Sequence, residues 1–299
     1  MKYRIYQVDS FTGERFHGNP AGVVPNADGL TEVQMQQIAR ELNNSETAFI
    51  FSSNDSRYDV EVRFFTPTTE VPLCGHATIA AHYVRAVEGN LTGRAIQKTK
   101  AGLLPVDIAF DGSDYSIVMT QAEPFVSKPF EKETVQDIVR ALGIKMDDLR
   151  EDCPVAIASA GHSKIMVGIR SRKLLDSLRP DAAALTEISH KVGCNGYYVF
   201  TLSPEEEILV HGRMFAPAIG IAEDPVTGNA NGPLGIYMVH FSICPQLQES
   251  DHFDFFIRQG EAIQRDGGMK VHVIKQDGRA VRVQITGRAV IAFRTEIEL

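Results

Sequence analysis

The sequence predicts an α+β protein of two pseudo-symmetric domains, each a curved, mostly antiparallel sheet wrapped around a central apolar helix. Three observations support this prediction. The chain repeats itself at a spacing of about 150 residues, each repeat contains alternating strand patterns, and each contains a helical segment with little charge on any face. A chain of 299 residues is long enough for two domains with buried cores.

The repeat rests on four ordered matches between the two halves. The segment Arg63–Pro67 (RFFTP) recurs as Arg213–Pro217 (RMFAP), an offset of 213 − 63 = 150. Seven residues beyond each proline come Cys74 and Asp224, which are again 150 apart. The upstream matches pair Ile38 with Ile188, at an offset of 150, and Ser45 with Cys194, at an offset of 149. Matches in one order at nearly one spacing indicate two copies of a folding unit.

The repeat also predicts the domain boundaries. Residues 1–122, completed by the last strand at 286–299, form the N-terminal half, and residues 123–285 form the C-terminal half. The linker is expected near Gln121–Pro129, where two prolines interrupt the strand pattern.

Each copy is expected to contain strands, a surface helix, more strands and a second helix. Thr31 is a suitable N-cap for an amphipathic helix that follows it. The second helix, at 77–84 and again at 230–239, is apolar all round, so strands must cover every side of it. The strands are predicted at Tyr3–Val8, Ala48–Phe51, Val60–Phe65, Ile165–Ile169 and Val281–Ile285.

Composition excludes several classes of function. With 30 basic and 38 acidic residues the formal charge is −8, which argues against a nucleic-acid partner. The chain contains no apolar run near the roughly 18 residues of a membrane span, and Met1–Ser10 lacks the apolar core of a signal peptide. The four cysteines are scattered without a C-x-x-C pair, so we expect a reducing cytoplasm, no disulfide framework and no metal site. No motif for nucleotides, dinucleotides or zinc is present, so no cofactor is expected.

The most informative segments are those where each apolar helix begins, Pro72–Thr78 and Glu223–Ala230. The first N–H groups of a helix have no partner inside the helix and carry partial positive charge. Glycine at such a position lets a ligand approach closely, so both segments could hold a carboxylate or stabilise an enolate. The structural alternative is that they only cap buried helices.

Three titratable side chains are candidates for the chemistry. Glu46 opens an apolar strand, where partial desolvation would raise its pKa into a range useful for moving protons. Its repeat counterpart, Asn195, does not titrate, so only one strong base is predicted. His76 and Asp224 lie at the two helix starts; the alternatives are an exposed glutamate, a satisfied core histidine and an N-cap carboxylate.

Cys74 suggests a nucleophile, because a helix N-terminus lowers the pKa of a thiol. Cys74 and His76 are two residues apart, however, and should not face each other on a helix. We therefore expect no cysteine–histidine pair. The other three cysteines are expected to be packing residues.

Several segments resemble the signature segments of the PhzF (phenazine biosynthesis F-like) isomerase family, and the resemblance covers essentially the whole chain. These segments are Gly18–Gly22 (GNPAG), Ser45–Phe49 (SETAF), Phe65–Pro72, Cys74–Thr78 (CGHAT), Glu223–Ala230 (EDPVTGNA) and Gln259–Gly260. The chain looks most similar to the bacterial members of YddE type, whose substrate is unassigned.

The resemblance implies a diaminopimelate-epimerase-like fold with an active site in the cleft between two similar domains. It implies an isomerase without a cofactor, with Glu46 as general acid/base and with His76 and Asp224 as catalytic residues that contact the substrate or tune the proton transfer. The residues that would bind a small carboxylic acid substrate are Asn19, Cys74, Gly75, Gly228 and Asn229. A homodimer follows from family analogy alone.

Two departures from the family leave alternatives open. The amino-acid epimerases and proline racemases of this fold use one cysteine per half, whereas the corresponding positions here are Cys74 and Asp224. Asn229 stands where the phenazine enzymes have serine, so the sequence does not give the substrate or pathway. The alternatives are an epimerase or racemase that uses Cys74, and a non-catalytic protein-binding member of the fold.

Overall fold

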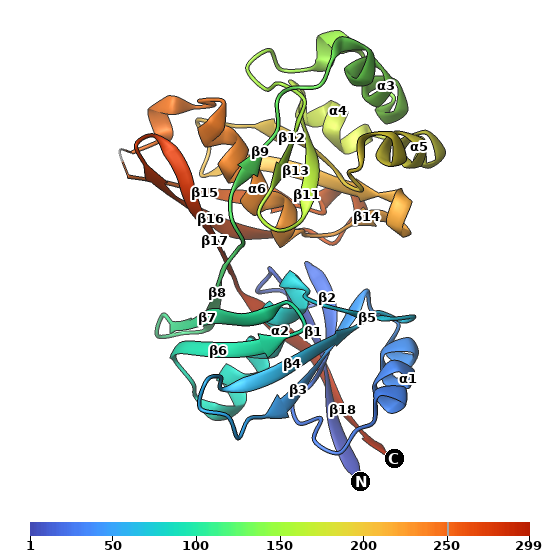
Figure 1. Ribbon diagram of the computed structural model, residues 1–299, viewed down its shortest axis with the longest axis vertical. Coiled ribbons are helices and arrows are strands. Elements are labelled where there is room, and N and C mark those ends of the chain that lie inside the picture. Colours follow the sequence, from blue (N-terminus) through green and yellow to red (C-terminus); the bar gives the residue numbers. More distant parts are fainter. Residues whose placement is uncertain (250) are drawn as a thin grey trace. The chain divides into compact units, whose positions relative to one another are not determined.

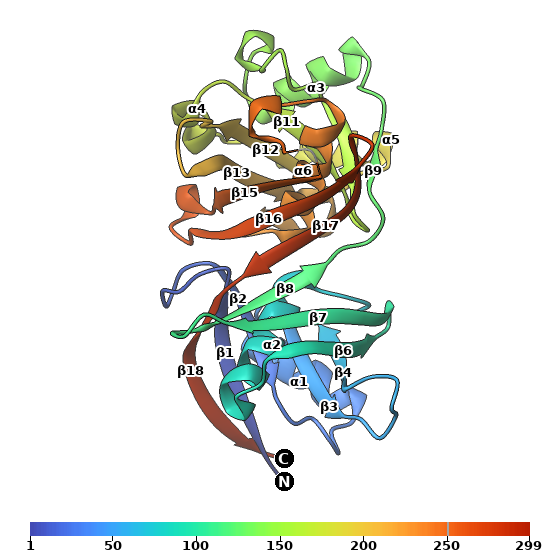
Figure 2. The ribbon, with the colours of Figure 1, turned by 90° about the vertical axis from the view of Figure 1, so that its left-hand side faces the viewer.

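The computed structural model describes residues 1–249 and 251–299, and Figures 1 and 2 show it from two sides. The chain divides into two compact units. Unit 1 contains Met1–Thr120 together with Thr286–Leu299, and unit 2 contains Gln121–Ile285. The first unit ends at Thr120, two residues before the boundary expected at residue 122 and directly before the expected linker, Gln121–Pro129.

Unit 1 is a mostly antiparallel sheet. Its strands are β1 (Lys2–Ser10), β2 (Asn19–Val24), β3 (Glu46–Ser52), β4 (Val60–Phe65), β5 (Glu70–Val71), β6 (Gly93–Thr99), β7 (Gly102–Phe110), β8 (Tyr115–Thr120) and β18 (Ala289–Glu298). Strand β1 lies between β18 and β2, and only the pairs β2–β3 and β4–β6 among those described in this unit are parallel.

Unit 2 repeats this arrangement. Its strands are β9 (Phe125–Val126), β10 (Ala156–Ser159), β11 (Ser163–Gly168), β12 (Tyr197–Leu202), β13 (Ile208–Ala216), β14 (Ile221–Asp224), β15 (His252–Gln259) and β16 (Gly267–Gln276), followed by β17 (Arg279–Gly287). From β10 to β16 the pairings are antiparallel, parallel, antiparallel, antiparallel, parallel and antiparallel. The run from β1 to β7 has the same order, so the predicted duplication is confirmed at the level of topology.

Each unit wraps its strands around one helix. In unit 1 helix α2 (Gly75–Gly89) packs against β1, β2, β3, β7, β8 and β18, and in unit 2 helix α6 (Gly228–His240) packs against β9, β10, β11, β15 and β16. Figure 1 shows each helix among the strands of its unit. Nearly every residue from Ala77 to Val84 and from Ala230 to Val239 is buried, as an apolar helix requires.

The remaining helices lie outside the sheets. Helix α1 (Glu32–Leu42) begins with the predicted cap, because Thr31 and Gln34 form a reciprocal capping box. It buries Met35 and Ile38 against unit 1. In unit 2 the helices are α3 (Lys132–Leu142), α4 (Arg172–Ser177) and α5 (Ala182–Val192), and the 3₁₀ turns are η1 (Met146–Asp148), η2 (Pro217–Ile219), η3 (Pro245–Leu247) and η4 (Glu261–Ile263).

The repeat also appears in matching side-chain contacts. The Arg63 guanidinium lies 5.2 Å from the ring centroid of Phe65 and pairs with Glu70 at 2.7 Å. Arg213 makes the same contacts in unit 2, 5.0 Å from the ring of Phe215 and 2.7 Å from Glu223. Because an arginine at the same strand position uses the same two kinds of partner, the duplication reaches the detail of packing.

One predicted equivalence is wrong. The offset of 150 pairs Cys74 with Asp224, but the structure pairs Cys74 with Thr227, since these two residues are the N-caps of α2 and α6. In the strand ladders Phe64 faces Val71, and Met214 faces Asp224. The offset is therefore 153 from β14 onward (224 − 71 = 153 and 227 − 74 = 153), because unit 2 has three more residues between β13 and β14, in the segment that contains η2.

Candidate active site

Glu46, Cys74 and His76 lie together in unit 1, and we call these three residues the acid–base cluster. Glu46 is the first residue of β3 and faces Ala21 of β2. Its Oε2 lies 3.4 Å from His76 Nε2, and the Glu46 side chain is 19% exposed. The partial desolvation expected from the sequence is therefore present. Ser45 Oγ lies 3.2 Å from the same imidazole nitrogen, a contact that the sequence did not indicate.

The position of His76 follows from the start of α2. Its side chain is 10% exposed, and its backbone carbonyl accepts a hydrogen bond of 2.8 Å from Ser10 Oγ. Ser10 pairs in turn with Asn19, which is buried at the start of β2. Asn19 is thus linked to the backbone of His76 through a neighbouring strand. Its predicted contact with substrate remains a prediction.

Cys74 and His76 do face each other, so the expectation from helical spacing is wrong. Cys74 Sγ lies 3.4 Å from His76 Nδ1. The prediction treated both residues as helical, but Cys74 is the N-cap and its backbone is extended, with φ −142° and ψ 125°. An N-cap side chain can turn back over the first helical residues, where the i,i+2 rule for helices does not apply.

The first turn of α2 provides hydrogen-bond donors beside this cluster. Thr78 N–H donates to the carbonyl of Cys74, and no acceptor for the N–H groups of Gly75 and His76 is found within the described residues. A Cβ atom built on Gly75 would meet nothing within 4 Å, so the glycine leaves open space at the helix start. This open, positively polarised end can receive an anionic oxygen.

In unit 2 side-chain hydrogen bonds hold the start of α6. Asp224, the last residue of β14, accepts a short hydrogen bond from Thr227 Oγ1. Gln259 is fully buried and binds this segment through both ends of its amide. Its Oε1 accepts from Thr227 N at 3.1 Å and from Asn231 Nδ2 at 3.0 Å, and its Nε2 donates to Asp224 O at 2.8 Å and Thr227 Oγ1 at 3.0 Å.

Gly228 and Asn229 are the first residues of α6. Throughout the ranges 1–249 and 251–299, no residue accepts a hydrogen bond from their N–H groups. The buried Oδ1 of Asn229 likewise has no donor. Asn229 is the structural counterpart of His76, because each is the second residue of its helix. The two helix starts therefore share their backbone geometry and differ in their titratable groups.

Lys164 is a polar residue of unit 2 that the sequence reasoning missed. It is half-buried on β11, and its methylene stem lies over Gly196, where a Cβ atom would come within 2.4 Å of Lys164 Cδ. Burial lowers the pKa of the Lys164 ammonium, and Cys194 and Asp224 oppose this shift. The only sequence signal was the glycine in Cys194–Tyr197 (CNGY), at the place where the other repeat has Thr47.

The acid–base cluster has the spacing of a metal site, because its three ligand atoms lie within 4.8 Å of one another. A thiolate, an imidazole and a carboxylate together form a donor set that suits zinc. Geometry alone does not require a metal here, and the absence of a metal cofactor stays a prediction.

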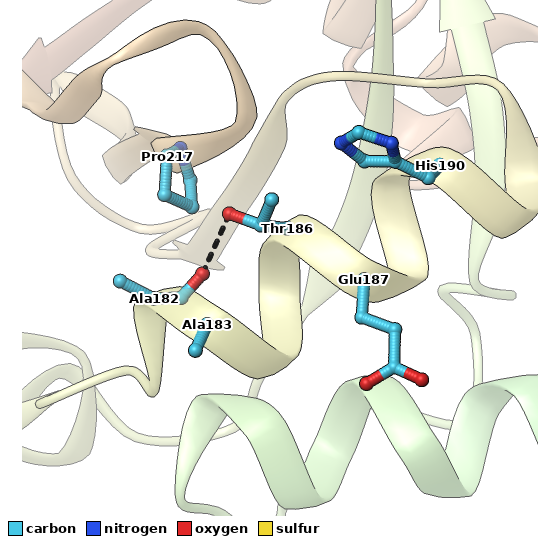
Figure 3. A pocket seen from close by; sticks show the side chains of 6 residues that line it. All are labelled: Ala182, Ala183, Thr186, Glu187, His190 and Pro217. Carbon is cyan, nitrogen blue, oxygen red and sulfur yellow. Dashed lines mark hydrogen bonds between the residues drawn. The ribbon is translucent and has the colours of Figure 1, made fainter.

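Unit 2 also has an open depression, whose side chains do not converge on one point as those of the acid–base cluster do. It is lined by α5 residues and Pro217, and Figure 3 shows Glu187 and His190 leaving the helix in different directions. Its one drawn hydrogen bond, from Thr186 Oγ1 to the carbonyl of Ala182, lies within the helix. Glu187 and His190 are therefore not placed to act together on one substrate in this depression.

The model of the family described as phenazine biosynthesis-like protein (PhzC-PhzF) matches residues 8–295. The chain belongs to this family. An uncharacterized isomerase from Clostridium acetobutylicum is 55% identical over 300 residues, which cover 100% of this chain and 99% of that protein. The uncharacterized isomerase YddE of Escherichia coli K12 is 48% identical over 301 residues, which cover 99% and 98%. The predicted membership is confirmed, and the chain is an isomerase of the PhzF type.

Solved structures agree with this assignment. A PhzF-family protein from Bacillus anthracis superposes with a TM-score of 0.90 at 29% identity and 100% coverage of both chains. A hydroxyproline epimerase from Agrobacterium vitis superposes with a TM-score of 0.64 at 15% identity, over 100% of this chain and 93% of the other, a likeness of fold alone. The expected epimerase-like fold of this PhzF-type protein is confirmed. None of the helices described for it is long and apolar enough to span a membrane.

Proposed function

We propose that this PhzF-type isomerase moves a proton on a small carboxylate-bearing substrate without a cofactor, with Glu46 as the acid/base, in a cleft between its two halves. The observation that carries the proposal is the half-buried Glu46 carboxylate, held 3.4 Å from His76 Nε2 beside the open start of α2. A positioned, partly desolvated carboxylate next to unpaired N–H groups has the parts that proton abstraction from a carbon acid needs.

The proposed reaction has two proton transfers. Glu46 takes a proton from a carbon next to the substrate carboxylate, and the electron pair of the broken C–H bond moves into the carboxylate as an enolate. The N–H groups of Gly75 and His76, with those of Gly228 and Asn229, are proposed to stabilise the enolate oxygens. Protonated Glu46 then returns the proton to a different carbon that is conjugated with the enolate, on the same face. The enolate electron pair forms the new C–H bond, so the carboxylate is restored and the double bond changes position.

His76 is proposed to orient Glu46. A neutral imidazole with its proton on Nε2 can donate to Glu46, while Nδ1 accepts from the Cys74 thiol at 3.4 Å. Asp224 is proposed to contact the substrate from the start of α6, where the hydroxyl of Thr227 fixes its carboxylate. A single base of this kind suits a shift between carbons, because inversion of a stereocentre needs bases on two faces.

Replacing Glu46 tests the proposal. We expect E46Q to slow solvent deuterium uptake by at least about 10²-fold, as is usual when a general base is lost. The measurement is proton NMR in D₂O with a panel of cyclic and unsaturated amino and hydroxy acids. E41Q, a change at an exposed helix residue of the same unit, is the matched control. Full turnover by E46Q would refute the assignment, and no uptake of deuterium by the wild-type protein with any acid would favour a binding module.

The contact between Cys74 and His76 supports a second candidate, an epimerase or racemase that uses the Cys74 thiolate as its base. The thiol lies at the N-cap of α2 and 3.4 Å from an imidazole nitrogen that could accept its proton. This reading predicts rapid inactivation by iodoacetamide, protection by substrate, and loss of deuterium exchange in C74A. If C74A exchanges normally while E46Q does not, the thiol is not the base.

A further inference from the structure

Lys164 of unit 2 stands at the position where the other repeat has a glycine, Gly22. In unit 1 Gly22 of β2 faces Thr47 of β3 in a parallel pair, and a Cβ atom on Gly22 would come within 2.7 Å of Thr47 Oγ1. In unit 2 Ile165 of β11 faces Tyr197 of β12 in the equivalent parallel pair. One residue earlier, Lys164 lies beside Gly196.

The glycine and the longer side chain therefore lie on opposite strands of the pair in the two units. In unit 1 the glycine is on the first strand, β2, whereas in unit 2 it precedes the second strand, β12. Ser45 matches Cys194, so Thr47 matches Gly196, and the parallel registers then match Gly22 with Lys164. Where unit 1 has a threonine over a glycine, unit 2 has a lysine over a glycine. Gly196, over which the lysine stem lies, directly follows Asn195, the counterpart of Glu46. The start of β3 in unit 1 thus carries the acidic Glu46, whereas the lysine Lys164 lies beside the start of β12 in unit 2.

The Lys164 ammonium lacks a counter-ion within its own unit. Its Nζ donates to the carbonyl of Ser163 at 3.1 Å, and no carboxylate in the described part of the chain forms an ion pair with it. Asp224 is near enough to affect the Lys164 pKa, but its Oδ2 already accepts from Thr227. Arg213, which is more deeply buried, pairs with Glu223 at 2.7 Å. Because a half-buried charge without a partner is costly, an unpaired one indicates a place for an external anion.

We propose that Lys164 binds a second carboxylate of the substrate, so that the protein acts on a dicarboxylic acid. The inference rests on the proposed function, in which the N–H groups of the helix starts hold the first carboxylate and Glu46 moves the proton. The chain carries a net charge of −8, which disfavours the approach of a dianion, so binding one requires a local cation. Lys164 is placed to supply it from β11, which packs against α6.

The test compares two planar acids that differ by one carboxylate. Furan-2,5-dicarboxylate and furan-2-carboxylate both resemble a carbon acid flattened by deprotonation, and their dissociation constants can be measured by isothermal titration calorimetry. We expect the wild-type protein to bind the diacid at least about tenfold more tightly, the gain of one charge-assisted hydrogen bond. K164M should reduce this ratio to near one and leave the affinity for the monoacid unchanged. K164R, which keeps the charge, should retain part of the preference.

K173M is the matched control, because Lys173 is exposed on α4 in the same unit. It should bind both acids as the wild-type protein does. If K164M does not fold, G196A offers a second route, since its methyl group displaces the lysine stem. Equal binding of the two acids by the wild-type protein, a preference that survives in K164M, or no binding of either acid would each overturn the proposal. The proposed function is judged separately, by the deuterium exchange rate of E46Q, so the two can fail independently.

Discussion

Replacing Gln259 by leucine should destabilise unit 2 by about 4 kcal/mol, within a range of about 2–6 kcal/mol. Leucine has a similar volume but cannot form the four hydrogen bonds of this fully buried amide. Asn231 Nδ2 loses its hydrogen bond to Gln259 but keeps the one of 3.0 Å to the carbonyl of Thr227, so this amide stays partly satisfied. The buried N–H of Thr227 and the half-buried carbonyl of Asp224 lose the amide partner that binds them, and the loss of such a partner costs roughly 1–3 kcal/mol for each group.

The assay is urea unfolding followed by circular dichroism, with Q276L as the control because Gln276 is exposed at the end of β16. The control should change the free energy of unfolding by less than about 0.5 kcal/mol. A loss below about 1 kcal/mol in Q259L would contradict the reasoning, since the start of α6 would then be held by other contacts. A shift of the midpoint at constant slope would show that stability itself has changed.

Two further predictions follow from buried contacts. G196A should remove the preference for the diacid as K164M does, yet change the free energy of unfolding by less than about 1 kcal/mol, because the Cβ atom meets the flexible stem of Lys164. His82 should make unit 1 less stable in acid: burial, reinforced by the Arg85 charge, lowers its pKa to about 3. The unfolded chain then binds one more proton below pH 6.5, so unfolding curves should lose about 1.4 kcal/mol per pH unit between pH 6 and pH 4, and H82Q should lack this component.

The sequence was sufficient to predict the duplication, the two wrapped helices and the cap at Thr31. These features depend on local patterns, such as a helix without a polar face or a threonine three residues before a glutamine. That Glu46 and His76 act on the same substrate was implied by the family resemblance, and their side chains lie 3.4 Å apart.

The errors came from assuming constant geometry along the chain. A fixed offset of 150 ignored the three extra residues near η2, whereas the N-caps of α2 and α6 and the ladder pairs of β5 and β14 show that Cys74 corresponds to Thr227. The helical spacing rule failed for Cys74 because its backbone is extended. Lys164 could not be predicted, since its position depends on a missing Cβ atom 32 residues later in the chain (196 − 164 = 32) and on the register of two parallel strands.

The two units share their topology but differ in the side chains at their helix starts, which indicates that they have different roles in catalysis. The contacts that stabilise the fold are repeated, as the arginine–aromatic pairs show, whereas the positions at the helix starts have diverged from His76 to Asn229 and from Cys74 to Thr227. Proton transfer is then proposed for unit 1 and substrate recognition for unit 2. If this is correct, substitutions in the acid–base cluster will change the rate of deuterium exchange, whereas those around Lys164 will change which acid is bound. A variant of Lys164 that slowed exchange equally for the monoacid and the diacid would contradict this division, because the loss would then concern the proton and not the second carboxylate.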